Sequence, residues 1–249
     1  MIAKMRNAWT SGDFLRPLYT AECLETIDRW EGVLSKPSPE NRKKTKIRVF
    51  KNGFIEQVLA KSHPIAPGVW AIPFSAWGLY RGFTGGHSGV AGTLGLYVVG
   101  VLLWTVIEYV LHRHVFHLEQ KTPGGKIRAF MMHGYHHEFP SDKMRLVAPP
   151  LMSGTFGIIF ATLYYLVLGP NFWLQVFAGT TMGYLLYDWS HYYAHHFNSQ
   201  NRLARWLRRY HLLHHYQDDD TRFGISTPLW DFVFGTFRSP SDAGAATPR

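Results

Sequence analysis

The sequence predicts an all-α integral membrane protein in which a bundle of four helices carries a cytosolic helical cap. Charge placement is the first observation behind this fold class. The 249 residues include 43 Asp, Glu, Lys and Arg, yet residues 146–187 form a run of 42 without any of them, and residues 82–107 form a run of 26. A membrane helix needs about 20 mainly apolar residues. We therefore expect membrane spans, although the mean hydropathy of −0.12 alone would suggest a soluble protein.

Four spans fit the apolar stretches of the chain. They are residues 62–80, 89–111, 150–168 and 172 to about 192. Prolines 64, 67 and 73 interrupt the first, which is the weakest span. The turn Gly169-Pro170-Asn171 separates the last two, because glycine and proline commonly mark turns.

The distribution of Lys and Arg predicts the orientation of these spans. Twelve lie before the first span, six in residues 112–146 and seven after Asp188, whereas the turns 82–88 and 169–171 contain none. With four spans, all the basic segments fall on one side, which should be cytosolic. Both termini and nearly all the histidines would share that side. The membrane would be the endoplasmic reticulum in a eukaryote and the inner membrane in a bacterium.

The chain divides into three regions. Residues 1–60 are a polar, mixed-charge arm, residues 61–238 are the membrane domain, and residues 239–249 are a flexible tail. Within the arm, residues 15–34 could form a short amphipathic helix, and residues 42–46 are a basic run. We expect the arm to be solvated or to lie on the membrane surface. The net charge of +9 fits anionic lipid headgroups better than nucleic acid, for which no motif is present.

Histidine placement is the second observation behind the fold class. Twelve of the 14 histidines follow residue 110, in four groups: His112, His114 and His117; His133, His136 and His137; His191, His195 and His196; His211, His214 and His215. Residues three and four apart share one face of a helix. The second and fourth groups obey that spacing, as does the pair His191 and His195. His112 and His117 are five apart, which fits ligands at the end of a helix better than ligands on one face.

This pattern predicts a metal centre in the cytosolic cap. Neutral imidazoles bind metals, whereas charged imidazoles packed together repel one another. A tetrahedral zinc takes at most four protein ligands, and ten suitable histidines would fill two sites of five. Haem ligation by two histidines would leave most of them unexplained, and a pH-sensing cluster would need a switch element that we do not see. Two redox metals at a membrane surface imply oxygen chemistry on lipid.

Several other polar residues lie near the histidine groups. Asp188 precedes His191 by three residues and could accept a hydrogen bond from a ligand imidazole. Glu108 is a charge at the membrane boundary beside His112, which is a hint of function. We expect the aromatic residues Trp230, Phe232 and Phe234 to pack beneath the metal site.

The four histidine groups together resemble the fatty acid hydroxylase/sterol desaturase superfamily, and within it the fatty acid 2-hydroxylases. The residues that carry the resemblance are 133–150 (HGYHHEFPSDKMRLVAPP), 187–196 (YDWSHYYAHH), 210–215 (YHLLHH) and 223–236 (FGISTPLWDFVFGT). The resemblance covers residues 65 to 238 and implies that residues 61–238 are a membrane hydroxylase domain. The ligand positions that it implies are His112, His117, His133, His136, His137, His191, His195, His211, His214 and His215. His114 and His196 are not expected to be ligands, and His63 and His87 should lie on loops.

The resemblance implies O2-dependent hydroxylation of the α-carbon (C2) of a fatty acyl chain, free or in a ceramide-type lipid. Two metal ions would serve as cofactors, with iron expected for activity and zinc possible after purification. Tyr187, Asp188, Asp142 and Arg145 are candidate catalytic or orienting residues. Because the 60 residues before the first span contain no histidine, a bis-histidine haem domain cannot form there. We therefore expect a separate electron donor, such as a cytochrome b5-like protein, a ferredoxin or a reductase, which could dock on the basic arm.

Two alternatives remain open at this point. One is hydroxylation or desaturation of a sterol or carotenoid by another member of the same superfamily. The other is a non-enzymatic membrane protein that stores or transports metal. Transporters usually place their ligands at the middle of the membrane, whereas these histidines lie at one boundary.

Overall fold

The computed structural model describes residues 9–30 and 44–242, and these residues fold as helices and connecting loops. Their one β-type pairing is an isolated antiparallel bridge between Tyr19 and Phe50. The predicted all-α class is therefore confirmed for this part of the chain. Residues 31–34 of the expected amphipathic helix, Arg42 and Lys43 of the basic run, and residues 243–249 of the expected tail lie outside the described residues.

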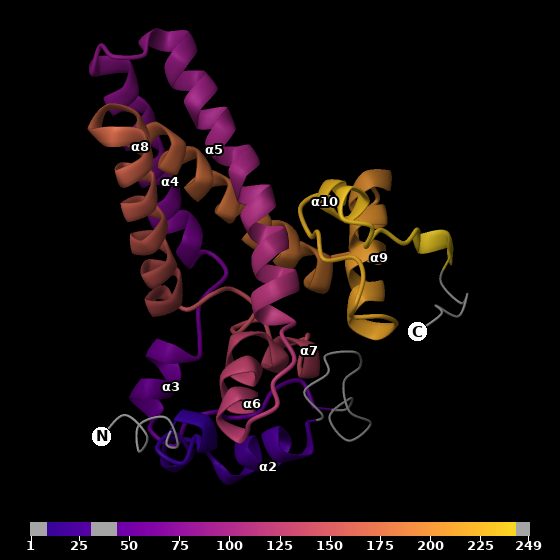
Figure 1. Ribbon diagram of the computed structural model, residues 1–249. Helices are drawn as coiled ribbons and strands as arrows, with labels where there is room; N and C mark the ends of the chain where they lie inside the picture. The colour runs from indigo at the N-terminus through magenta and orange to yellow at the C-terminus, as the bar shows by residue number, and fades with distance from the viewer. Residues whose placement is uncertain (1–8, 31–43, 243–249) are drawn as a thin grey trace.

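Three long helices form one end of the molecule: α4 (Ala66–Thr84), α5 (Gly89–Leu111) and α8 (Pro150–His196). Gly169, with φ 71° and ψ 175°, interrupts α8 and divides it into arms of residues 150–168 and 170–196. The arms fold back on each other, as Figure 1 shows. The Tyr164 ring packs against Phe177 at 6.2 Å, and the Thr180 hydroxyl donates a hydrogen bond to the Tyr164 oxygen at 3.2 Å. The predicted turn at residues 169–171 is thus present.

Two helical stretches are long and apolar enough to cross a membrane, Gly89–Phe116 and Pro150–His196. Only 17% and 6% of the residues in their most apolar windows are buried. The core helix of a soluble protein would be mostly buried, so these exposed apolar surfaces indicate a membrane protein. Helix α4 does not meet the same criterion. The bundle of four spans therefore remains a prediction.

The helix boundaries agree closely with two of the expected spans and differ at the first. Helix α5 covers the expected residues 89–111. Helix α4 begins at Ala66, four residues later than expected, and continues to Thr84. Pro67 occupies the first turn, where a missing N–H costs nothing, and Pro73 is accommodated inside the helix.

The described part of the N-terminal region is integrated into the fold. Helix α2 (Ala21–Arg29) begins after Thr20, whose hydroxyl caps it by accepting the Cys23 N–H. This start is six residues later than expected. Helix α3 (Gly53–Leu59) follows the segment of residues 44–52. Figure 1 shows α2 lying beside α6 (Pro123–Ala129). Buried side chains from both regions form one hydrophobic core: Tyr19, Cys23, Ile27, Trp30, Ile47, Val49, Phe50, Ala60, Ile127, Ala129, Phe130, Tyr135 and Phe139. These residues are therefore packed into the fold and do not form a solvated arm.

A buried ionic cluster joins the N-terminal region to the second histidine group. The Arg145 guanidinium forms ion pairs with Glu56 of α3 and with Asp142, and all three side chains are about 95% buried. Arg145 also donates a hydrogen bond to the Tyr135 hydroxyl at 2.8 Å, which itself donates to Asp142 at 2.9 Å. Because a buried charge is costly unless it is paired, this cluster fixes α3 against the segment that begins at His133.

Helices α5 and α8 approach each other most closely at two glycines. A Cβ atom on Gly100 would overlap the carbonyl oxygen of Val176, and one on Gly179 would overlap the carbonyl oxygen of Tyr97. Small residues allow helix backbones to pack this closely in a membrane. The crossing therefore depends on the absence of a side chain at both positions.

We predict that Gly100→Val destabilises the protein by about 1–3 kcal/mol, because overpacking forces the two helices apart. The thermal unfolding midpoint in detergent micelles measures the effect. Gly95→Val is the matched control, since Gly95 lies on the same helix with open space around it. Equal shifts in the two variants would contradict the close crossing.

Candidate metal centre

Ten histidines gather into two groups of five at the ends of the long helices. In each group, one ring nitrogen per residue lies within 4.8 Å of all the others. We call the first group site 1 and the second site 2. Site 1 contains His112, His117, His133, His137 and His214, and site 2 contains His136, His191, His195, His211 and His215. These are the ten residues named from the sequence, and their division into two fives matches the expected count.

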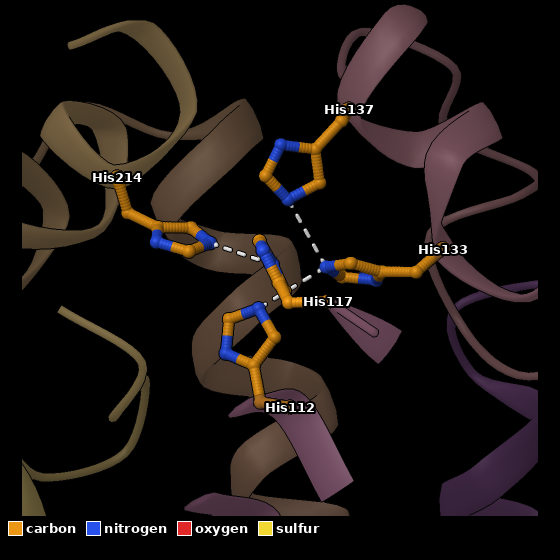
Figure 2. Close-up of side chains that lie close together, drawn as sticks. All are labelled: His112, His117, His133, His137 and His214. Carbon is orange, nitrogen blue, oxygen red and sulfur yellow. Dashed lines mark hydrogen bonds between the residues drawn. The ribbon is translucent and has the colours of Figure 1, made fainter. Parts of the chain in front are cut away.

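The rings converge through their Nε2 atoms. Figure 2 shows the five rings of site 1 pointing toward a common centre. The Nε2 atom of His133 lies 3.1 Å from those of His112 and His137, and the His117–His214 pair is also 3.1 Å apart. In site 2, the Nε2 atom of His136 is 3.1 Å from that of His215 and 2.9 Å from that of His191, and His195–His211 is 2.8 Å.

Two of the four histidine groups contribute to both sites. His133 and His137 belong to site 1, whereas His136 between them belongs to site 2. Likewise His211 and His215 of α9 (Arg202–Tyr216) belong to site 2, and His214 belongs to site 1. In both groups, the two histidines that are four residues apart belong to one site, and the histidine between them belongs to the other site. The pair His191 and His195, on the last turns of α8, lies wholly in site 2.

A π-helix explains the spacing of His112 and His117. Residues His112–Phe116 form one turn of π-helix at the end of α5, and the His117 N–H donates to the His112 carbonyl oxygen at 3.1 Å. This i→i+5 hydrogen bond brings residues five apart onto one side of the helix. A second π-turn, Phe130–Gly134, carries His133 and leads into α7 (Tyr135–Glu138). The sequence spacing predicts a helix end for the first pair but does not predict either π-turn.

Two backbone carbonyls fix the tautomers of two site 1 histidines. His112 Nδ1 lies 2.6 Å from the Phe223 carbonyl oxygen, and His214 Nδ1 lies 2.7 Å from the Thr221 carbonyl oxygen. Because a carbonyl only accepts, Nδ1 must carry the hydrogen in each ring. In the neutral imidazole, Nε2 is then a bare lone pair directed into the site. This donor set fits a metal ion.

Burial keeps these imidazoles neutral. It lowers the pKa values of six of them well below 6.5, and neighbouring imidazoles lower all six further: His117, His133, His136, His211, His214 and His215. Desolvation is the larger cause, because it penalises the charged form. Neutral imidazole is the form that binds metals.

The other candidate residues occupy different positions around the metal centre. Asp142 and Arg145 lie in the ionic cluster described above. Asp188 is buried, but neither its Oδ2 nor His191 Nδ1 has a hydrogen-bond partner within the described residues, so the expected contact between them is not formed. The Tyr187 ring lies 5.8 Å from that of His191. His114 is exposed, His196 belongs to neither site, and His63 and His87 lie on loops as expected.

The expectation that the aromatic residues near residue 230 pack beneath the metal site was wrong for Phe232 and Phe234. Phe232 and Phe234 of the segment around α10 (Leu229–Val233) are 59% and 51% exposed. Asp231 is fully buried and is the residue of this short helix that faces inward. The residues that follow it in the helix therefore face outward. Asp231 lies within the motif of residues 223–236, but no role for it was predicted from the sequence. A carboxylate within an apolar stretch was the available signal.

A cavity of about 390 Å³ opens onto the metal centre. Its lining includes His133, His136 and His191, together with Tyr187 and Asp188. It continues between the arms of α8 and the neighbouring helices, where most lining residues are apolar, including Trp104, Met131, Leu146, Phe156, Phe160 and Phe177. An elongated apolar ligand entering this cavity would bring one end to the histidines.

The lowered histidine pKa values predict a pH dependence of stability. Below about pH 6.5 the unfolded chain takes up protons that the folded, metal-free protein excludes, so stability falls as the pH falls. Each such imidazole contributes up to about 1.4 kcal/mol per pH unit. Thermal unfolding of metal-free protein between about pH 8 and pH 5 measures this slope. His136→Gln should reduce the slope and the exposed His114→Gln should not; a flat profile would contradict the prediction.

Comparison with known proteins places these features in a family. The fatty acid hydroxylase family matches residues 97–236. The dihydroceramide fatty acyl 2-hydroxylase of Arabidopsis thaliana is 35% identical over 76% of this chain and 79% of its own length. The ceramide very long chain fatty acid hydroxylase of Schizosaccharomyces pombe is 37% identical over 74% of this chain, and human fatty acid 2-hydroxylase is 33% identical over 76%. This chain spans only 53% and 56% of those two proteins.

The fold agrees with that of a solved structure, full-length Scs7p, in which only the hydroxylase domain is visible. The TM-score is 0.73 and the identity 32%, over 82% of this chain and 76% of that one. The histidine geometry, the family match and the shared fold lead to one conclusion: this chain belongs to the fatty acid hydroxylase family.

Proposed function

We propose that this protein hydroxylates the C2 carbon of a fatty acyl chain, free or in a ceramide-type lipid, with two metal ions bound at sites 1 and 2. The observation that carries the proposal is the mainly apolar cavity whose lining includes His133, His136 and His191. The names of the relatives supply the position of attack, since both the plant and the human protein are 2-hydroxylases.

The reaction has a defined balance. One atom of O2 enters the C2–H bond, the other leaves as water, and two electrons and two protons are consumed. Two redox-active metals bound to the histidines would supply the activation of O2. Iron is the metal that we expect to be active. Zinc generally binds nitrogen sites more tightly than iron does. Zinc found in the purified protein would therefore not identify the working metal.

The side chains of this protein position the substrate and keep the site dry. The apolar wall between Trp104 and Phe177 holds the acyl tail, and the acyl carbon chain then presents its carbonyl end at the histidines. Tyr187 and Asp188 are the polar groups that we assign to that end of the substrate, because they line the cavity beside His191. The charge of Arg145 is already matched by Glu56 and Asp142. We therefore assign Arg145 and Asp142 to positioning the segment that bears His133, His136 and His137.

The electrons require a donor. We propose a separate redox protein that docks on the cytosolic face. The basic run of residues 42–46 is one candidate docking site, but within it Lys44 forms an ion pair with Glu22 at 2.7 Å. The exposed face of α9 is a second basic surface, with Arg202, Arg205 and Arg209 opposite the ligand face. Complementary charge would steer an acidic donor there.

We predict that cells expressing this protein accumulate 2-hydroxy acyl chains in their lipids, and that His136→Ala abolishes the accumulation by removing a site 2 nitrogen. Lipid extraction and mass spectrometry measure both results. His114→Ala is the matched control, because His114 is exposed and belongs to neither site. Altered sterols or carotenoids without 2-hydroxy acyl chains would support a different reaction of the superfamily. Metal uptake into vesicles without lipid oxidation would support the transport alternative.

We also propose that the protein crosses the membrane several times, with both termini and the metal centre on the cytosolic side. Helix α10 supplies a marker of depth. Its Trp230 Nε1 donates to Thr105 of α5 at 2.9 Å, and the exposed apolar side chains around it continue the exposed face of α5: Leu229, Phe232, Val233 and Phe234. We expect these four side chains to contact lipid.

We predict that a nitroxide on Phe232→Cys, in protein reconstituted into lipid vesicles, is relaxed more by O2 than by a water-soluble nickel chelate. A nitroxide on Ser199→Cys, in the loop between α8 and α9, should show the opposite order. The native Cys23 does not interfere, because it is fully buried and burial raises its pKa to about 12. Preferential relaxation of the Phe232→Cys label by the nickel chelate would contradict lipid contact.

A further inference from the structure

Two buried carboxylates hold the loop that lies over site 1. Asp231 accepts the N–H groups of Phe223 and Gly224 at 2.9 and 2.8 Å. Glu108 accepts those of Ile225 and Ser226 at 2.6 and 2.9 Å, together with the Ser226 hydroxyl. Four consecutive backbone N–H groups are thus bound by two carboxylates from distant parts of the chain. We call residues 221–226 the bracing loop.

The same loop orients two ligands of site 1. Its carbonyl groups at Thr221 and Phe223 receive the Nδ1–H groups of His214 and His112. The Phe223 ring also packs against the rings of His112, His117 and His214, at 5.7, 5.3 and 5.6 Å. A shift of the loop would therefore move both carbonyl acceptors, and His112 and His214 would no longer be held in the Nδ1–H tautomer.

Three of the five site 2 histidines have no such partner in the described structure. The Nδ1 atoms of His191, His211 and His215 are buried, and none has a hydrogen-bond partner among the described residues. Outer hydrogen bonds to ligand histidines fix their tautomer and raise their basicity, and their loss typically weakens metal binding about 10–100-fold. The two sites therefore differ in preorganisation although each has five imidazoles.

We propose that Asp231 and Glu108 are positioning residues that make site 1 the tighter of two unequal metal sites, so that the sites fill in order. The inference rests on the proposed metal centre and adds to it a cause of inequality. The carboxylates act through the backbone of the bracing loop and do not touch the metals. Loop geometry depends on carboxylate acceptors, since Asp231 faces the N–H groups of Phe223 and Gly224 and the hydroxyl of Thr236.

Asp231→Asn tests this role with almost no change in shape. The amide NH2 group would face a backbone N–H, so two donors would meet where a donor and an acceptor met before. The probe is Co²⁺, titrated into purified metal-free protein and followed by its visible absorption. We expect wild-type protein to bind two Co²⁺ ions in a tight and a weak step, and Asp231→Asn to weaken only the tight step, by about 10–100-fold.

Ligand variants assign the two steps. His137→Ala should remove the tight step, and His195→Ala should remove the weak step, because each belongs to one site only. Glu119→Gln is the carboxylate control, since Glu119 is exposed close in sequence to His117. Equal weakening of both steps by Asp231→Asn, or no weakening of either, would overturn the bracing role. Absence of Co²⁺ binding by wild-type protein would instead contradict the metal centre itself.

A second measurement needs no Asp231 variant. Nitrogen-15 NMR of the metal-free protein, labelled at histidine, should show Nδ1–H tautomers for His112 and His214, assigned by the loss of one signal in His214→Gln. Nε2–H tautomers at both residues would overturn the proposal, whether or not Asp231→Asn folds.

Discussion

The rest of the structure depends on holding ten imidazoles together in a buried space with their Nε2 atoms facing inward. Neutral rings arranged in this way offer lone pairs to one another, and charged rings would repel. Neither state is stable without a fixed scaffold or a cation that all the nitrogens share. The scaffold is extensive: the ends of α5 and α8, two π-turns, α9 and the bracing loop all converge on the two sites. The core beneath the His133 segment and the ionic cluster around Arg145 hold that segment against the N-terminal region.

Much of this arrangement follows from simple patterns in the sequence. Stretches without charge predicted the long helices, and glycine followed by proline predicted the bend at Gly169. Helical spacing singled out eight histidines of the two sites, and the resemblance to the hydroxylase family added His112 and His117. These predictions succeeded because they depend on local periodicity and on the cost of exposing or burying a charge.

The features that were missed depend on tertiary contacts. A π-turn is closed by an i→i+5 hydrogen bond, whereas an α-turn is closed by an i→i+4 bond. The spacing of His112 and His117 therefore predicted a helix end and could not reveal the π-turn. His136 and His214 belong to a different site from the other two histidines of their groups, and this depends on how the helices face one another. The N-terminal region looked solvated because its average polarity is high. Its buried residues, such as Cys23, Ile27 and Val49, are separated by charged ones that remain at the surface.

The second arm of α8 sets a fixed distance between the far end of the bundle and the metal centre. Its 27 residues extend without a break from Pro170 to His196, about 40 Å at 1.5 Å per residue. The hydrocarbon core of a typical bilayer is about 30 Å thick. With its Pro170 end at one face of that core, a rod of this length would project beyond the opposite face, where the proposed topology places His191 and His195. The thickness of the host membrane would then determine the distance between the two metal sites and the lipid tails.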